Sequence, residues 1–112
     1  MITHIIQEND WEEAKKKGIY DPPSLGSEGF IHCSNIDQVV DVANKNFDGE
    51  EDLLLLLIDE KKVESKVVYE DLYSEGEKYP HIYGPLNIEA VQEVHSFLSD
   101  DDGRFKLPGS LR

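Results

Sequence analysis

Arginine and cysteine are both scarce in this sequence of 112 residues. The only arginines are Arg104 and Arg112, and the single basic cluster, Lys15–Lys17, lies just after two glutamates. Clusters of Lys and Arg hold the phosphates of nucleic acids and of anionic membranes. With 24 acidic against 11 basic side chains, and a formal net charge of −13, we expect neither duplex nucleic acid nor a membrane as a partner.

Long apolar segments and paired cysteines are missing as well. The run Leu53–Ile58 contains six large aliphatic residues, whereas a membrane-spanning helix needs about 20. The amino terminus has neither the basic lead nor the apolar length of a secretory signal. Cys33 is the one cysteine and cannot form an intramolecular disulfide, which suits a reducing compartment. We therefore expect a cytoplasmic protein. The sequence does not predict its oligomeric state.

The apolar residues that are present predict a single α+β domain over residues 1–112. Leu53–Ile58 shows no alternation of polar and apolar residues, which indicates a strand buried on both faces. Residues 36–47 carry apolar side chains at the spacing of one helix face. Strands are expected at 2–6, 30–33, 53–58 and 67–69, and short helices at 9–17 and 36–47.

Local signals set the expected ends of these elements. Asn9 or Asp10 is expected to cap the first helix and Gly18 to end it, and Ser34-Asn35 to cap the second. Residues 21–29 contain two prolines and two glycines, which predicts a loop without regular structure. Residues 79–85 read as a tight segment constrained by a proline near each end. Residues 88–98 fit a helix and a strand equally well.

Three of the four histidines lie in segments of interest. His4 is in the first expected strand, His32 is in the strand before the second helix, and His81 is between Pro80 and Gly84-Pro85. Any one of them alone is typical of a partly buried histidine bonded to the main chain, so a functional interpretation depends on the three together. Their spacing matches no zinc motif, and we expect no metal site.

Other side chains that could carry chemistry have ordinary interpretations beside the functional ones. Cys33 or Ser34 could act as a nucleophile near a helix amino terminus, but the alternatives are a small core residue and a helix cap. Glu70 follows the strand at 67–69 and precedes the His81 segment, where a carboxylate could act as a base or orient a ribose hydroxyl. The alternative for Glu70 is one more solvated acid.

Several blocks of the sequence resemble one known family. These are Ser24-Leu25, Glu28–Ser34 followed by Gln38, and Tyr79–Leu86. In this order they are similar to Domain of Unknown Function 952, a family of small bacterial and plant proteins. The resemblance covers nearly the whole chain, from His4 to Leu107-Pro108.

The resemblance implies an ADP-ribosyltransferase-like fold, similar to that of the RNA 2′-phosphotransferases. This fold has a split, mainly antiparallel β core and two short helices. In that superfamily a first-strand histidine contacts the ribose of NAD, and a histidine or tyrosine on a second strand lies beside the nicotinamide. His4 and His32 match these two positions. Glu70 is the candidate for the catalytic glutamate, and the phosphate-binding arginines of the 2′-phosphotransferases have no counterpart.

The resulting hypothesis is a domain that binds NAD or a related nucleotide in a histidine-lined cleft, with NAD as a substrate and no firm cofactor. If the domain is an enzyme, it cleaves or transfers at the ribose–nicotinamide bond: His4 holds the ribose, His32 orients the nicotinamide or a phosphate, and Glu70 stabilises the oxocarbenium-like transition state. The expected ligand-binding residues are Ser24, Phe30, Ser34, Gln38, His81 and Tyr83.

Two alternatives from other classes stay open. One is a non-catalytic module that binds a small metabolite or a protein partner, which the missing arginines and the lack of a clear counterpart to the superfamily's late catalytic glutamate favour. The other is a hydrolase that uses Cys33 or Ser34. The pyrophosphate of NAD would also meet a strongly acidic protein, so main-chain amides, the histidines and Lys15–Lys17 would have to offset the repulsion.

Overall fold

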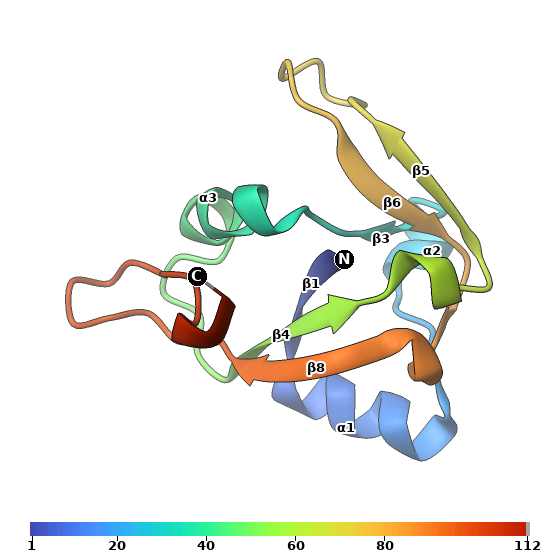
Figure 1. Cartoon of the computed structure of the whole chain (residues 1–112), viewed down its shortest axis with the longest axis horizontal. Coiled ribbons are helices and arrows are strands. Elements are labelled where there is room, and N and C mark those ends of the chain that lie inside the picture. The colour runs from blue at the N-terminus through green and yellow to red at the C-terminus, as the bar shows by residue number, and fades with distance from the viewer. Residues whose placement is uncertain (112) are drawn as a thin grey trace.

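The computed structural model describes residues 1–111, and Figure 1 shows how its strands and helices are arranged. The strands are β1 (Ile2–Gln7), β2 (Ile19–Tyr20), β3 (Ile31–His32), β4 (Leu53–Ile58), β5 (Lys66–Glu70), β6 (Tyr79–Tyr83), β7 (Leu86–Asn87) and β8 (Val91–Ser96). The helices are α1 (Glu8–Lys17), α2 (Ser24–Ser27) and α3 (Ile36–Asn46), with 3-10 turns η1 (Glu60–Lys62), η2 (Ile88–Ala90) and η3 (Gly109–Leu111).

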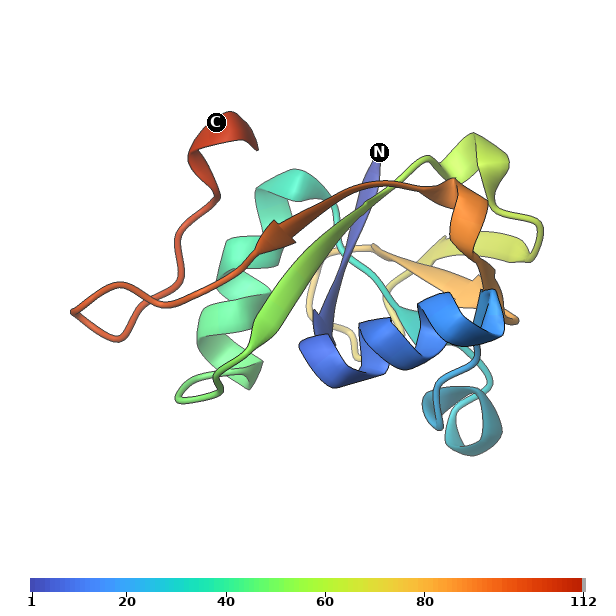
Figure 2. The same ribbon diagram turned by 90° about the horizontal axis from the view of Figure 1, so that it is seen from below.

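The aliphatic run forms β4, the central strand of an antiparallel sheet with the order β1-β4-β8, here called sheet 1. Leu56 and Ile58 pack in one core cluster with Trp11 of α1 and with side chains of a second sheet. Leu53 and Leu55 belong to another cluster, which includes residues of α3 and the carboxyl-terminal segment. Both faces of β4 are covered, which explains why its sequence does not alternate. Figure 2 shows α1 and α3 beside this sheet.

The second sheet, sheet 2, has the order β3-β6-β5 and is also antiparallel. Two residues after its edge strand β3, Ser34 forms one isolated bridge with Thr3 of the edge strand β1 of sheet 1. The two residues exchange main-chain hydrogen bonds of 2.7 and 2.9 Å, and the Thr3 hydroxyl donates a third to the Ser34 carbonyl at 2.8 Å. A short β2-β7 pair completes the strands. The split, mainly antiparallel α+β arrangement is therefore confirmed.

The expected cap of α1 is wrong. The helix begins at Glu8, one residue before the first of the two expected caps, and Gln7 precedes it without a side-chain cap. The reason is that β1 runs directly into the helix: the amide of Glu8 donates to the Asp52 carbonyl at 2.9 Å, so the main chain satisfies a free amide. The other end agrees with the prediction, because Gly18 has φ +80° and its amide donates to Ala14.

The cap of α3 is confirmed, with Asn35 as the N-cap residue. The side chain of Gln38 accepts the Asn35 amide at 2.9 Å and donates to the Lys78 carbonyl at 2.8 Å. Gln38 thus joins the start of α3 to the segment that leads into β6. This contact gives Gln38 a structural role that its expected role in ligand binding did not include.

Two segments differ from their expected structure. Residues 24–27 form one helical turn, α2, inside the expected loop, because Pro22 and Pro23 accept main-chain bonds from the residues that follow. Residues 79–83 are a regular strand, although Pro80 lies in it. The carbonyl of Pro80 accepts a hydrogen bond from the Cys33 amide, so the position of its missing N–H also faces the β3 side. Because β3 ends at His32, the missing N–H lies beyond the paired part of β3.

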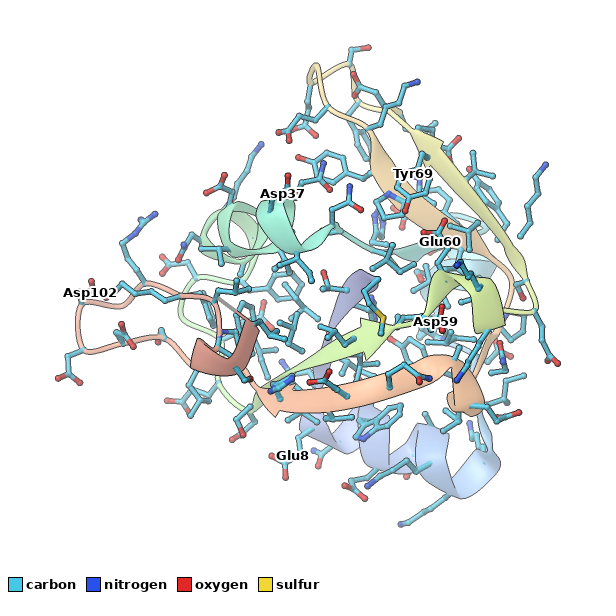
Figure 3. The ribbon with its side chains drawn as sticks, viewed as in Figure 1. Glu8, Asp37, Asp59, Glu60, Tyr69 and Asp102 are labelled. Carbon is cyan, nitrogen blue, oxygen red and sulfur yellow. The ribbon has the colours of Figure 1, made fainter. Side chains whose placement is uncertain are left out.

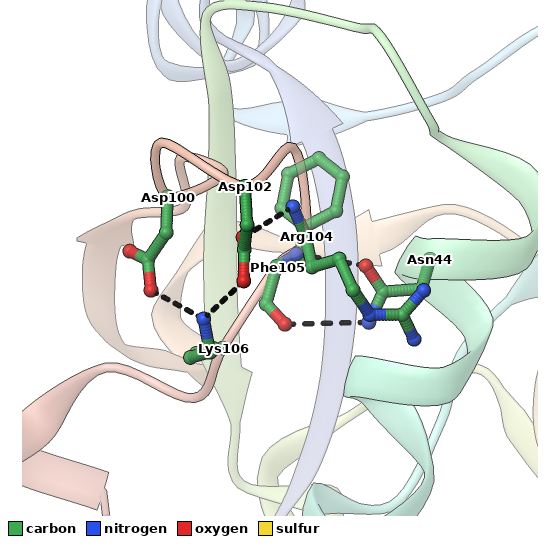
Figure 4. Close-up of polar contacts among 6 residues, drawn as sticks. All are labelled: Asn44, Asp100, Asp102, Arg104, Phe105 and Lys106. Carbon is green, nitrogen blue, oxygen red and sulfur yellow. Dashed lines mark hydrogen bonds and ion pairs between the residues drawn. The ribbon is translucent and has the colours of Figure 1, made fainter.

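The ambiguous segment 88–98 is now resolved: it opens with η2 and continues as β8 along β4. After β8 the chain forms a turn that is fastened to α3, as Figure 4 shows. Asn44 accepts the Phe105 amide at 2.7 Å and donates to the Phe105 carbonyl at 3.3 Å, as a neighbouring strand would. This contact helps to hold Phe105 in the core beside Phe97.

The edge strand β5 of sheet 2 is tied to η1, which follows β4. Tyr69 of β5 donates its hydroxyl to Glu60 at 2.7 Å, and Asp59 caps the turn by accepting the Lys61 amide at 3.0 Å (Figure 3). This contact and the Thr3–Ser34 bridge lie on different elements, so the two sheets are linked at more than one place. Within residues 1–111, no helix has the length and apolar character needed to cross a membrane.

Candidate functional site

The candidate site is at the seam between the two sheets, next to the Thr3–Ser34 bridge. His4 follows Thr3 on β1, and His32 lies two residues before Ser34 on β3. His32 pairs with His81 across the β3–β6 register, so these two side chains share one face of sheet 2. The topology therefore brings together three histidines that are far apart in the sequence.

His4 is held in a single tautomer. Its Nδ1 lies 2.6 Å from the main-chain oxygen of His32, which can only accept, so Nδ1 carries the proton. Nε2 then accepts a hydrogen bond from the Tyr20 hydroxyl at 3.0 Å. Burial lowers the pKa of His4 to about 4, and the bond to His32 only partly opposes this effect. His4 is therefore neutral at pH 7.

His32 and His81 form an aromatic group with Phe30. The rings of His32 and His81 are 5.7 Å apart and nearly perpendicular, and Phe30 stacks on His81 with a centroid distance of 4.3 Å. Phe30 also meets the edge of His32 at 4.9 Å. These contacts fix the planes of both histidine rings, since sterically matched aromatic groups hold each other in place.

Each of these two histidines has a carboxylate partner. Nε2 of His32, which is about half exposed, lies 2.6 Å from Glu28 at the end of α2. Nδ1 of the buried His81 lies 2.8 Å from Oε2 of Glu70, and the Tyr83 hydroxyl donates to the same oxygen. The bonds from Tyr83 and His81 hold the pKa of Glu70 below its usual range, so Glu70 is ionised at neutral pH.

A pocket of about 720 Å³ opens at this seam. Five of the predicted site residues line it: His4, His32, His81, Ser24 and Ser34. Other parts of the wall come from α3, from the segment between β5 and β6, and from the start of β6, and they include Lys45, Glu75, Glu77 and Tyr79. Its volume lies within the range of small-molecule sites in proteins, about 300–1,000 Å³.

Four other predicted residues do not line the pocket. Glu70 lies behind His81, and Tyr83 is bonded to Glu70. Phe30 is buried beneath the two histidine rings, and Gln38 is engaged by main-chain groups. These four residues lie near the pocket but do not line it. The sequence therefore predicted the region of the site, but it did not predict which side chains reach the pocket.

Tyr20 and Lys45 are among the wall residues that the sequence analysis missed. Tyr20 is the hydrogen-bond donor to His4, but a tyrosine three residues after a helix end forms no recognisable motif. Lys45 is the only Lys or Arg among the described residues of the wall, and it forms an ion pair with Glu75 at 2.9 Å. The Lys15–Lys17 cluster, at the end of α1, does not line the pocket.

The structure does not favour Cys33 as a nucleophile. The thiol is buried, and burial raises its pKa, so the reactive thiolate is disfavoured. The main-chain groups of Ser34 are used in the bridge to Thr3, and Ser34 precedes the N-cap of α3. Within residues 1–111, no group of three or more His, Cys, Asp and Glu side chains is arranged to hold a metal ion.

Comparison with known proteins gives a family and a fold. A family model described as "Protein of unknown function (DUF952)" matches residues 5–94. The crystal structure of CC0527 from Caulobacter crescentus is 29% identical, with a TM-score of 0.86 over 98% of this chain and 96% of that chain. The solution NMR structure of CC0527 is 27% identical, with a TM-score of 0.75 over 95% and 91% of the two chains. No curated protein matches this sequence.

Proposed function

We propose that this chain, which belongs to the DUF952 family of proteins of unknown function, binds NAD or a related nucleotide in the pocket lined by His4, His32 and His81. The expected relationship to the ADP-ribosyltransferases is part of this proposal. The observation that carries it is the convergence of the three histidines on one pocket from β1, β3 and β6.

The chemistry of the wall supports a ligand with a sugar and a flat ring. The Tyr20 hydroxyl, which donates to neutral His4 and can still accept, and the Ser24 hydroxyl offer polar groups for ribose hydroxyls without requiring a charged ligand. The half-exposed ring of His32 offers an aromatic face or edge for a nicotinamide. The phosphates would be neutralised only by Lys45, which already has Glu75 as a partner, so we expect weak binding of NAD.

The position of Glu70 supports a second candidate function. A glutamate that stabilises an oxocarbenium-like transition state directly must contact the sugar, but Glu70 is bonded to His81 and Tyr83 and does not line the pocket. The same pocket without direct glutamate chemistry would be a non-catalytic binding module for a small metabolite. The two candidates share the pocket and differ in turnover.

An amide-resolved NMR titration with NAD, ADP-ribose and nicotinamide tests the proposal. Saturable shifts should cluster at His4, at residues 30–34 and at residues 79–83. His32→Ala should weaken NAD binding at least tenfold, whereas His95→Ala should leave it unchanged. His95 is a matched control because it is a histidine on β8 with its own carboxylate partner, Glu93, and it does not line the pocket.

The same titration can reject the proposal. Shifts that are absent at millimolar NAD, ADP-ribose and nicotinamide would remove the nucleotide from consideration. Equal NAD affinity in the wild-type protein and in His32→Ala would show that NAD binds away from the predicted pocket. Spectra of both variants without ligand would show whether each variant keeps the fold.

A further inference from the structure

His81 is the most buried of the three histidines of the pocket, with only 3% of its surface exposed. It lies on β6, the central strand of sheet 2, with Phe30 stacked on one side and His32 against it. A polar ring this buried needs hydrogen-bond partners, because an unpaired polar atom away from water costs about 1–3 kcal/mol. The partners of its two nitrogens therefore define what His81 does.

One nitrogen of His81 is fully accounted for. Nδ1 is 2.8 Å from the Glu70 carboxylate, which can only accept, so Nδ1 carries a proton. The carboxylate is fixed in turn by the Tyr83 hydroxyl and by the pairing of β5 with β6. The tautomer of the neutral ring is thereby set, with the lone pair on Nε2.

The other nitrogen of His81, Nε2, has no hydrogen-bond partner among residues 1–111. In the same described part of the chain, every side-chain nitrogen or oxygen that is fully buried has a partner, so Nε2 is not fully buried. His81 lines the pocket, and the small exposed part of its ring thus presents Nε2 to that space.

A carboxylate, an imidazole and a free lone pair in this order make a general base. The carboxylate fixes the ring, keeps the lone pair on the outer nitrogen and stabilises the imidazolium that forms when this nitrogen takes a proton. General-base catalysis of this kind contributes about 10²–10⁴-fold to a rate. Glu70 does not line the pocket and contacts the ring on its Nδ1 side, so its effect passes through His81.

We infer that His81 is the general base of this pocket, that Glu70 positions it, and that together they promote hydrolysis of the N-glycosidic bond of an oxidised nicotinamide nucleotide. This inference depends on the proposed function, which places such a nucleotide in the pocket. It assigns Glu70 a role different from direct contact with the sugar.

The step balances without a further reactant. A water molecule gives a proton to Nε2 of His81 as its oxygen bonds to C1′ of the ribose. The bond from C1′ to the nicotinamide nitrogen breaks, and its electron pair stays on that nitrogen, so the positively charged ring leaves as neutral nicotinamide. The imidazolium then releases its proton to solvent.

The test combines nicotinamide release, measured by chromatography, with NAD affinity, measured by NMR titration, on the full chain. His81→Asn keeps a donor near the position of Nδ1 and removes the base, so turnover should fall about 10²-fold or more while NAD affinity stays within about threefold. Glu70→Gln should lower kcat about tenfold or more at unchanged affinity. Glu60→Gln is the matched control, because Glu60 also accepts a tyrosine hydroxyl but lies outside the pocket wall.

The nitrogen NMR shifts of the histidine rings add a readout that a purely structural role would not change. In the neutral form of the wild-type His81 ring the proton should lie on Nδ1, and Glu70→Gln should mix the two tautomers. Spectra of His81→Asn and Glu70→Gln without ligand show whether each variant keeps the fold. If one variant is unfolded, the other is used to test the inference.

Each outcome bears on a different claim. Wild-type protein that binds NAD and releases no nicotinamide overturns the catalytic inference and leaves the proposed function in place. No binding of NAD overturns both. Nicotinamide release at the wild-type rate by a folded His81→Asn or Glu70→Gln protein overturns the assignment of the base or of its positioning residue.

Discussion

A ring nitrogen of His4 donates to the main-chain oxygen of His32 at 2.6 Å. The two histidines are therefore joined through the backbone of one and the side chain of the other. Replacing the side chain of His32 leaves this bond in place, whereas replacing His4 breaks it. The contributions of the two residues to ligand binding and to stability can thus be measured separately.

Acid should destabilise the protein in part through His4. Its pKa is lowered to about 4 in the folded protein but is about 6.5 in the unfolded chain, so the unfolded state binds more protons between these values. The free energy of unfolding should therefore fall as the pH is lowered from 6.5 to 4, by up to about 3 kcal/mol from this group. Urea denaturation across this range measures the slope.

His4→Asn serves as the comparison for the acid effect, because asparagine keeps a donor for the His32 carbonyl and does not titrate. The variant should show a shallower decline over the same pH range. Equal slopes in the wild-type protein and the variant would mean that His4 takes up no extra proton on unfolding.

Removing the Tyr20 hydroxyl should cost stability. Tyr20→Phe leaves Nε2 of His4 without its donor, so we expect a loss of about 1–3 kcal/mol in the free energy of unfolding. Tyr69→Phe removes the hydroxyl of an exposed tyrosine, which donates to Glu60, and the loss in the free energy of unfolding should be smaller. Comparable losses in the two variants would contradict the importance of the Tyr20–His4 bond.

Asn44 should be required for docking of the carboxyl-terminal segment. Asn44→Ala removes both hydrogen bonds to the main chain of Phe105, and we expect a loss of about 1–3 kcal/mol, read from thermal unfolding. Lys106→Ala breaks exposed ion pairs with Asp100 and Asp102 in the same turn and should change stability little (Figure 4). A larger loss from Lys106→Ala than from Asn44→Ala would reverse this assignment.

Gly84 should not tolerate a side chain. A Cβ at this position would lie 2.5 Å from the Ser65 hydroxyl oxygen, and the φ of +148° is strained for other residues. Gly84→Ala should therefore lower the midpoint of urea unfolding. Gly26→Ala is the control, since it lies in α2 with no atom near a built Cβ, and it should be neutral or stabilising. A neutral Gly84→Ala protein would mean that Ser65 moves aside without cost.

The parts of the fold that depend on neighbouring residues were predictable. The unbroken aliphatic run predicted β4, and Asn35 predicted the start of α3. The start of α1 was not predicted, because its first amide is satisfied by Asp52, far along the chain. Residues 79–85 were interpreted as a tight segment constrained by prolines, since the sequence does not reveal that β3 ends before the missing N–H of Pro80 would be needed.

The site was predictable as a set of histidines but not as a geometry. His4, His32 and His81 line the pocket as expected, yet the direct pairing of His32 with His81 follows from a sheet register that local sequence does not specify. Glu70 was placed correctly near the histidines at a strand end. Its position behind His81 depends on the same register, and so does the role proposed for it.

The pairing of β1 with β4 also has a consequence for the order of events during folding. The first strand does not pair with its neighbour in the sequence, so its partner, Leu53–Ile58, must be present before sheet 1 can start to form. During synthesis β1 therefore cannot pair until β4 has been made, and the pocket cannot form until His81 has been made. We expect loop closure over these long intervals to limit the folding rate, as it does in proteins with high contact order.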